Sequence, residues 1–166
     1  MSSLDERLQN RDYANWLRVT YGLKCIKEGL CTVTGRVMLY FQENIKNQHN
    51  IAEACSNESC NSKSIKQQGV DNFKCPNNVC TIFLKSIVAE HANKKMIVWD
   101  NCDVRHWPVK CWEIAKAYMP RGQVNNTGPA TTDCSGLLQL ISKCKLFRSQ
   151  MQMSPAAAEQ VKHAVC

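Results

Sequence analysis

The sequence lacks any apolar run long enough to cross a membrane. Its longest uninterrupted run is the five residues Val37–Phe41, whereas a membrane-spanning helix needs about 20 apolar residues. The first residues, Met1–Arg7, are mostly polar and charged, and no apolar stretch follows them, which is unlike a secretory signal. We therefore expect a chain that is not secreted, makes no contact with a membrane, and resides in the cytoplasm or nucleus.

The motifs of common catalytic sites are also missing. The sequence contains no glycine-rich phosphate loop, no nucleophile-elbow pentapeptide and no His-Glu-x-x-His. Asp103, Arg105 and His106 lie between two expected elements, where active-site groups often sit, but the same residue types are typical of an ordinary helix cap. The sequence thus favours a non-catalytic function.

No segment is strongly basic, although the formal net charge is +7. The longest basic run is the pair Lys94 and Lys95, and the excess is spread along the whole chain. A diffuse positive charge gives weak, salt-sensitive attraction to any polyanion. We therefore expect at most weak, non-specific binding of nucleic acid, unless folding gathers five lysines on one face: Lys63, Lys66, Lys74, Lys94 and Lys95.

The sequence does contain helical periodicity on both sides of residues 50–80. Residues 3–49 begin with a Ser-x-x-Glu capping box, formed by Ser3 and Glu6, and continue with an apolar stripe. Gly29 and Gly35 are candidates for a turn that divides this stretch into two helices. Further helices are expected over residues 82–92, 107–119, 135–145 and 154–166, with a short strand over 96–99. The prediction is a single, mainly α domain over residues 1–166 with at most one short strand pair.

Residues 50–80 form a cysteine-rich insertion in this domain. They show no periodicity, and a structureless loop of about thirty residues is uncommon in a compact domain unless something other than a core organises it. Cys55-x4-Cys60 and Cys75-x4-Cys80 are two short-spaced pairs, and such pairs are typical of a tetrahedral zinc site with thiolate ligands. We predict that Cys55, Cys60, Cys75 and Cys80 bind zinc.

A second ligand set competes with this one. His91 and Cys102 also lie nearby in the sequence, so Cys75, Cys80, His91 and Cys102 could form the site instead. If residues 81–91 are one continuous helix, however, Cys80 and His91 lie about 16 Å apart, whereas ligands of one zinc lie within about 4 Å of each other. We favour the first set and keep the second open, together with buried free thiols and disulfides.

The remaining cysteines and the tryptophans are expected in the core. A free cysteine behaves as a small buried hydrophobe, which applies to Cys25, Cys31, Cys111, Cys134 and Cys144. Tryptophans can stack on bases, but tryptophan at helical spacing more often belongs to a core. We apply this interpretation to all four: Trp16, Trp99, Trp107 and Trp112.

Two segments carry a family resemblance. Val98–Cys102 and Trp107–Gly122 resemble an uncharacterised vertebrate family whose human member is encoded by open reading frame thirty-eight of the X chromosome. The resemblance extends over most of residues 10–147, including Tyr13, Trp16 and His91. Members of that family are longer and continue into a helical region similar to HEPN domains, which are associated with RNA binding or cleavage. The present sequence contains no Arg-x4–6-His motif of that region, so the resemblance implies a family without a transferable activity.

Two functions compete on these grounds. The first is a zinc-stabilised, non-catalytic interaction or scaffold module of a longer intracellular protein, with a protein partner. The alternative is a nucleic-acid-binding domain, for RNA or DNA, in innate-immune sensing or RNA processing. The two differ in whether lysines and arginines gather on one face of the folded chain.

Overall fold

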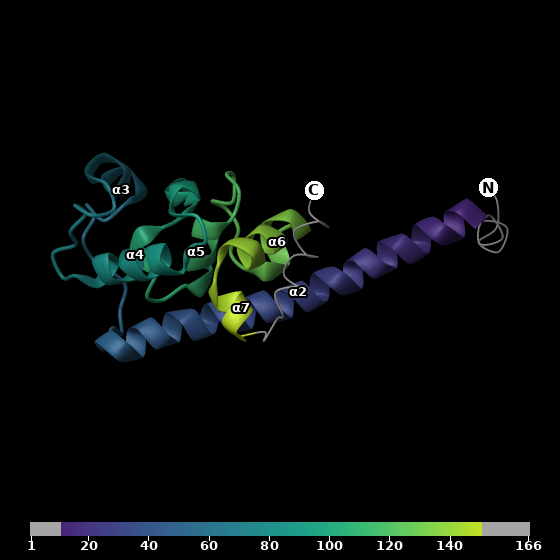
Figure 1. Ribbon diagram of the computed structural model, residues 1–166, viewed down its shortest axis with the longest axis horizontal. Helices are drawn as coiled ribbons and strands as arrows, with labels where there is room; N and C mark the ends of the chain where they lie inside the picture. The colour runs from purple at the N-terminus through teal and green to yellow at the C-terminus, as the bar shows by residue number, and fades with distance from the viewer. Residues whose placement is uncertain (1–10, 151–166) are drawn as a thin grey trace.

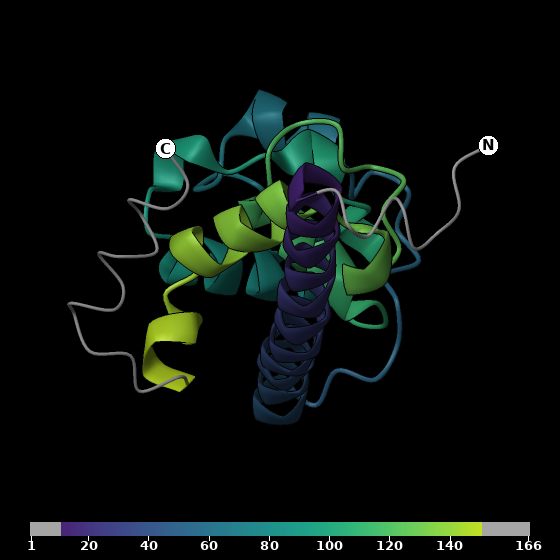
Figure 2. The ribbon, with the colours of Figure 1, turned by 90° about the vertical axis from the view of Figure 1, so that its right-hand side faces the viewer.

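The longest helix described is α2 (Arg11–His49), against which most of the other α-helices pack. The computed structural model describes residues 11–150, and α2 runs along most of the ribbon (Figure 1). Its 39 residues, at about 1.5 Å each, extend roughly 58 Å. The C-terminal half lies against the other helices, whereas the N-terminal half projects beyond them (Figure 1). The view from the N-terminal end shows this projecting part in front of the body (Figure 2).

The predicted turn at Gly29 or Gly35 is wrong, because both residues lie inside α2. A glycine in a helix interior costs about 1 kcal/mol relative to alanine but does not by itself end the helix. Gly35 also lies against the body, since a Cβ at this position would lie 3.7 Å from Cγ of Pro129. Tertiary packing therefore supports the helix across the position where the sequence suggested a break.

Shorter helices follow α2 and are joined by 3₁₀ turns. The α-helices are α3 (Ser62–Gln68), α4 (Val79–Glu90), α5 (Cys111–Ala115), α6 (Cys134–Lys143) and α7 (Leu146–Gln150). The 3₁₀ turns are η1 (Lys94–Met96), η2 (Trp99–Asn101), η3 (Val104–His106), η4 (Lys116–Tyr118) and η5 (Pro129–Thr131). None of the helices within residues 11–150 is both long and apolar enough to cross a membrane.

Two of the helices expected from the sequence are confirmed. The helices over 82–92 and 135–145 correspond to α4 and α6, and the Asp133 side chain caps α6 by accepting from the amide of Gly136 at 2.6 Å. The helix expected from residue 107 begins only at Cys111, because the amides of residues 109 and 110 both donate to the His106 carbonyl in a separate turn. The predicted capping box at residues 3–6 and the helix over 154–166 lie outside the described residues.

The predicted short strand over residues 96–99 is wrong. These residues pass from η1 into η2, and the Val98 amide donates to the Ala117 carbonyl at 3.1 Å as a single bond rather than a ladder. Within residues 11–150 no strand forms, and the one antiparallel bridge, between His91 and Cys144, is isolated. The fold is therefore mainly α, with a cysteine-rich insertion.

The core lies between the covered half of α2 and the helices α4, α5 and α6. The buried residues of α2 are Thr34, Val37, Met38, Phe41, Gln42 and Ile45. The Gln42 side chain donates to the Trp107 carbonyl at 2.7 Å and so satisfies a buried polar pair. The core extends into the insertion, where Ile65 and Phe73 are buried. The insertion is thus packed onto the domain and leads directly to the cysteines.

Candidate metal centre

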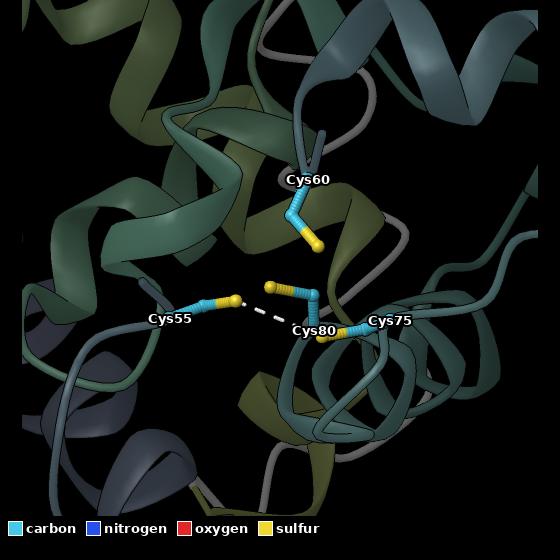
Figure 3. A group of neighbouring side chains, drawn as sticks. All are labelled: Cys55, Cys60, Cys75 and Cys80. Atoms are coloured by element: carbon cyan, nitrogen blue, oxygen red, sulfur yellow. Dashed lines mark hydrogen bonds between the residues drawn. The ribbon is translucent and has the colours of Figure 1, made fainter. Parts of the chain in front are cut away.

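Four cysteines from three separate segments converge on one point (Figure 3). Cys55 follows α2, Cys60 precedes α3, Cys75 precedes α4, and Cys80 lies in the first turn of α4. Their four sulfur atoms all lie within 4.8 Å of one another. The structure thus brings together the group that the spacing of the two pairs indicates.

Backbone hydrogen bonds fix the segments that carry these side chains. The Cys55 amide donates to the carbonyl of Arg105 at 3.0 Å, which ties the loop after α2 to the turn η3. The Cys75 amide donates to Oγ1 of Thr81 at 2.9 Å, and the Asn78 amide donates to the Cys75 carbonyl at 2.8 Å. These bonds form the tight turn into α4 that places Cys75 beside Cys80.

The sulfur separations suit a metal and not a disulfide. The Sγ atoms of Cys55 and Cys75 are 3.7 Å apart, and a tetrahedron with zinc–sulfur bonds of about 2.3 Å has edges of about 3.8 Å. A disulfide would require about 2.05 Å. All ten cysteines within residues 11–150 are free thiols.

The four thiols are buried, and this controls their ionisation. Their exposed fractions are 4%, 2%, 6% and 1% in chain order. Burial, followed by the neighbouring Cys75 and Cys55, raises the pKa of Cys60 to about 12. Burial likewise raises the pKa of Cys80 far above its ordinary value. Burial also acts to raise the pKa of Cys75, but the Cys80 amide and the neighbouring thiols outweigh it and lower that pKa. The cluster favours one thiolate over several, and a divalent cation would supply the missing charge and release protons on binding.

Sequence reasoning missed Asn77, which lies beside the cluster. Its Oδ1 is 2.7 Å from the Sγ of Cys75 and 3.8 Å from that of Cys55, and it also accepts from the Val79 amide. A half-turn of the amide group would present an N–H to a thiolate, but at the loss of the hydrogen bond from the Val79 amide. Neither cysteine spacing nor local pattern marks this residue, because its role depends on the turn between Cys75 and α4.

The two alternative ligands lie outside this group. Helix α4 is continuous from Val79 to Glu90, so Cys80 and His91 lie at opposite ends of it, about 16 Å apart along its axis. His91 is buried and stacks on the Tyr118 ring, with centroids 5.0 Å apart. The Cys102 thiol is also buried and donates to the Val98 carbonyl at 3.8 Å. The geometry thus unites the first predicted ligand set and separates the second.

Asp103, Arg105 and His106 lie on or next to the turn η3. Asp103 and His106 pair with each other across η3, with Oδ2 and Nδ1 2.7 Å apart on a partly exposed turn, whereas Arg105 contributes its carbonyl to hold Cys55. The expected core position is confirmed for Trp99, Trp107 and Trp112 and for Cys144. Cys31, Cys111 and Cys134 are only partly buried. It is wrong for Trp16, which is 59% exposed, and for Cys25, which is exposed. Both lie on the projecting half of α2, which none of the elements described within residues 11–150 covers.

Comparison with known proteins places this architecture in a family. The family model described as "Domain of unknown function (DUF4559)" matches residues 7–163. The "Uncharacterized protein CXorf38 homolog" of Mus musculus is 30% identical over 148 residues, which cover 89% of this chain and 46% of that relative. The chain thus spans less than half the length of this relative, and no solved structure matches it. The match confirms the resemblance carried by Val98–Cys102 and Trp107–Gly122, and the chain belongs to the DUF4559 family.

Proposed function

We propose that this chain is a zinc-stabilised, non-catalytic interaction module that presents the projecting half of α2 to a helical protein partner. The observation that carries the proposal is an apolar stripe on α2 whose C-terminal part is buried and whose N-terminal part is exposed. The four thiols would bind zinc and so fix the body from which the helix projects. The module belongs, in this proposal, to a longer intracellular protein.

The stripe is continuous along the helix. Eighteen residues are five turns of an α-helix, so Trp16, Val19 and Leu23 lie on the same face as residues 34, 37 and 41. The latter three are buried against the body. The former three are 59%, 62% and 56% exposed. Apart from Thr34, a mostly apolar face is therefore covered in the C-terminal half of α2, whereas no described residue covers it in the N-terminal half.

An uncovered apolar face of this kind suits an amphipathic helix as a partner. Large exposed apolar patches on folded proteins commonly mark interaction sites, and anchors at i, i+3 and i+7 match the packing of one helix along another. Ile26, which is 57% exposed, widens the same face. Aromatic anchors such as Trp16 tend to dominate the energy of such interfaces.

Zinc would act through the insertion. The loop after α2 holds Cys55 and the first turn of α4 holds Cys80, so one ion would clamp the end of α2 to the body. In small metal sites the unfolded chain has no preformed site, so the free energy of metal binding stabilises the folded state. Four thiolates in a tetrahedral arrangement are the donor set that zinc prefers.

Elemental analysis of the purified chain tests the zinc site. We expect about one zinc per chain, loss of this zinc in Cys60→Ser, and full retention in the matched control Cys25→Ser, whose thiol is exposed and distant in sequence. Full zinc occupancy in a Cys55→Ser/Cys60→Ser double variant would contradict the proposed ligands and favour a site containing His91 and Cys102.

Site-specific photo-crosslinking in cells tests the stripe. A crosslinking amino acid at Leu23 should yield one discrete protein adduct that is lost on Val19→Glu. The same amino acid at Cys25, about 200° around the helix, should not yield it. Equal adducts from both positions, or none from Leu23, would contradict the proposed surface.

A further inference from the structure

A second feature of the molecule is an open cavity on the body, distinct from both the thiol cluster and the stripe. It has a volume of about 550 Å³ and lies where α3, the η1–η2 segment, the residues after η4 and the end of α6 meet. Four cationic side chains and one carboxylate line it: Lys66, Lys95, Arg121, Lys143 and Asp100. The cations come from four separate segments, so only folding brings them together.

Three of these cations have no acidic partner in the part of the chain that the structure describes. Lys66 is paired with Asp100, whose carboxylate oxygens lie 2.8 and 2.9 Å from Nζ. Within residues 11–150, no ion pair involves Lys95, Arg121 or Lys143. Among the described residues, the cavity therefore carries an excess positive charge that no neighbouring carboxylate neutralises.

Lys143 is a partly buried cation whose hydrogen-bond acceptor is neutral. The acceptor is Oε1 of Gln139, which lies 2.7 Å from Nζ. Burial lowers the pKa of Lys143, and the charge of Lys143 in turn contributes to lowering the pKa of His91. A partly desolvated cation without a counter-charge is stabilised by any anion that enters the cavity.

The backbone of the segment that carries Arg121 is held by hydrogen bonds from a buried side chain. The buried Asn101 side chain donates to the carbonyls of Lys116 and Pro120 at 3.1 and 2.8 Å, and it accepts from the Gln123 amide. These bonds fix the chain on either side of Arg121.

The other large cavity of the body provides a contrast. It has a volume of about 620 Å³, and its two cations, Arg105 and Lys116, face three carboxylates, those of Glu58, Asp103 and Glu113. Lys116 and Glu113 form a buried ion pair of 2.7 Å. Charge in that cavity is already compensated, so the cation surplus distinguishes the first one.

We propose that the cavity lined by Lys95, Arg121 and Lys143 binds a small organic di- or triphosphate. Three cations without an acidic partner among residues 11–150 carry more positive charge than one carboxylate would neutralise. Their charge matches that of two or three phosphate groups. Arginine supplies the planar fork that recognises phosphate oxygens. The volume lies within the range of about 300–1,000 Å³ typical of small-molecule sites, and Met96 and Ile97 offer an apolar wall for the uncharged part of the ligand.

Calorimetric titration of the metal-loaded chain with pyrophosphate and with ATP tests this proposal. Both should bind saturably, and Lys95→Gln/Arg121→Gln should weaken binding at least tenfold. Both residues are exposed, so the variant should melt like the parent. The matched control Lys63→Gln/Lys85→Gln removes two exposed lysines outside the cavity and should change the Kd less than twofold.

Three outcomes would overturn the proposal. The first is no binding of either probe at about 100 mM salt. The second is an equal loss in the control variant, which would mean that only the diffuse charge attracts the anion. The third is binding of a single-stranded RNA decamer through Lys95 and Arg121 with no binding of ATP, which would assign the cations to a nucleic acid instead. None of these readouts depends on the stripe of α2.

Discussion

Trp112 illustrates how much a single buried side chain contributes to this small core. It is 4% exposed, and its Nε1 donates to Oγ1 of Thr132 at 3.2 Å, which joins α5 to the segment before α6. Truncation of a buried tryptophan to alanine costs about 3–5 kcal/mol. We expect this loss in the free energy of unfolding of Trp112→Ala, measured by urea denaturation. Trp16→Ala, on the exposed part of α2, should change it by less than about 0.5 kcal/mol; a Trp112→Ala chain as stable as the parent would place this indole on the surface.

His91 should make the fold sensitive to acid. Burial is the main reason that its pKa is lowered to about 4, and the positive charges of Lys143 and Lys145 add to the effect. The Asn93 amide donates to Nδ1, whereas the buried Nε2 is without a partner among the described residues. The Tyr118 ring stacks on this histidine and the Cys144 backbone forms a bridge with it. Burial raises the pKa of both residues. The imidazole is therefore neutral in the folded chain at pH 7.

The sign of the pH dependence follows from this lowered pKa. The unfolded chain takes up a proton near pH 6.5 and the folded chain only near pH 4, so stability is full above about pH 6.5 and falls as the pH drops to about 4. The loss is on the order of 3 kcal/mol over this interval. Denaturation at pH 7.5, 6.0 and 5.0 should show a weaker pH dependence for His91→Asn, which keeps an acceptor for the Asn93 amide. Protonation of thiols would affect the pH dependence of stability in the parent and in the variant alike. Parallel plots of unfolding free energy against pH for the two proteins would therefore contradict a buried neutral His91.

At the scale of elements, the continuity of α2 through Gly29 can be tested directly. A Cβ at Gly29 would meet nothing within 4 Å, and alanine in a helix interior is favoured over glycine by about 0.5–1 kcal/mol. Gly29→Ala should therefore stabilise the chain by about this amount and raise its helical circular dichroism. Gly69→Ala should instead destabilise it, because Gly69 has φ +77° at the end of α3. Destabilisation by Gly29→Ala would indicate the turn that the sequence alone suggested.

The elements differ in how far the sequence could predict them. The thiol cluster was predictable because its signal is local, namely two pairs of cysteines at fixed spacing. The unbroken α2 was not, because a glycine lowers helix stability by only about 1 kcal/mol, and whether it ends the helix depends on the rest of a 39-residue helix that packs along its C-terminal half. Periodicity also cannot distinguish a covered apolar stripe from an exposed one. Trp16 and Trp112 were therefore both predicted to lie in the core, but only Trp112 is buried.

At the scale of the whole molecule, the three features described above lie on different parts of the chain. The thiol cluster follows the C-terminal end of α2, whereas Trp16 lies about 33 residues before that end, or roughly 50 Å along the helix. The cation-lined cavity belongs to the body. A partner on the stripe and a phosphate in the cavity could therefore bind at the same time, and metal removal should affect the cavity more than the projecting helix.

The distribution of charge over the whole molecule leads to a prediction about nucleic acids. Of the five lysines that folding could have gathered, only Lys66 and Lys95 line the cavity, and Lys66 is already paired with Asp100. Three unpaired cations in one hollow can hold a few phosphates but offer no track for a polymer. With about three phosphate contacts, the slope of log K against log salt for a single strand should be only about −2. We therefore expect a Kd no tighter than about 10⁻⁶ M at 150 mM salt.

Fluorescence anisotropy with short single- and double-stranded RNA and DNA at 50, 100 and 200 mM salt measures both the affinity and the slope. A steep slope would mean that more cations contact the polymer than the cavity offers, which requires a basic surface extending beyond it. Nanomolar binding that disappears when the five lysines are replaced by glutamate would identify the chain as a nucleic-acid-binding domain, and the proposed interaction module would then be wrong. The substitutions are Lys63→Glu, Lys66→Glu, Lys74→Glu, Lys94→Glu and Lys95→Glu. Weak binding with a shallow slope is the result expected from a chain whose +7 charge is dispersed, because affinity for a polyanion depends on how many cations reach the phosphates together and not on the net charge.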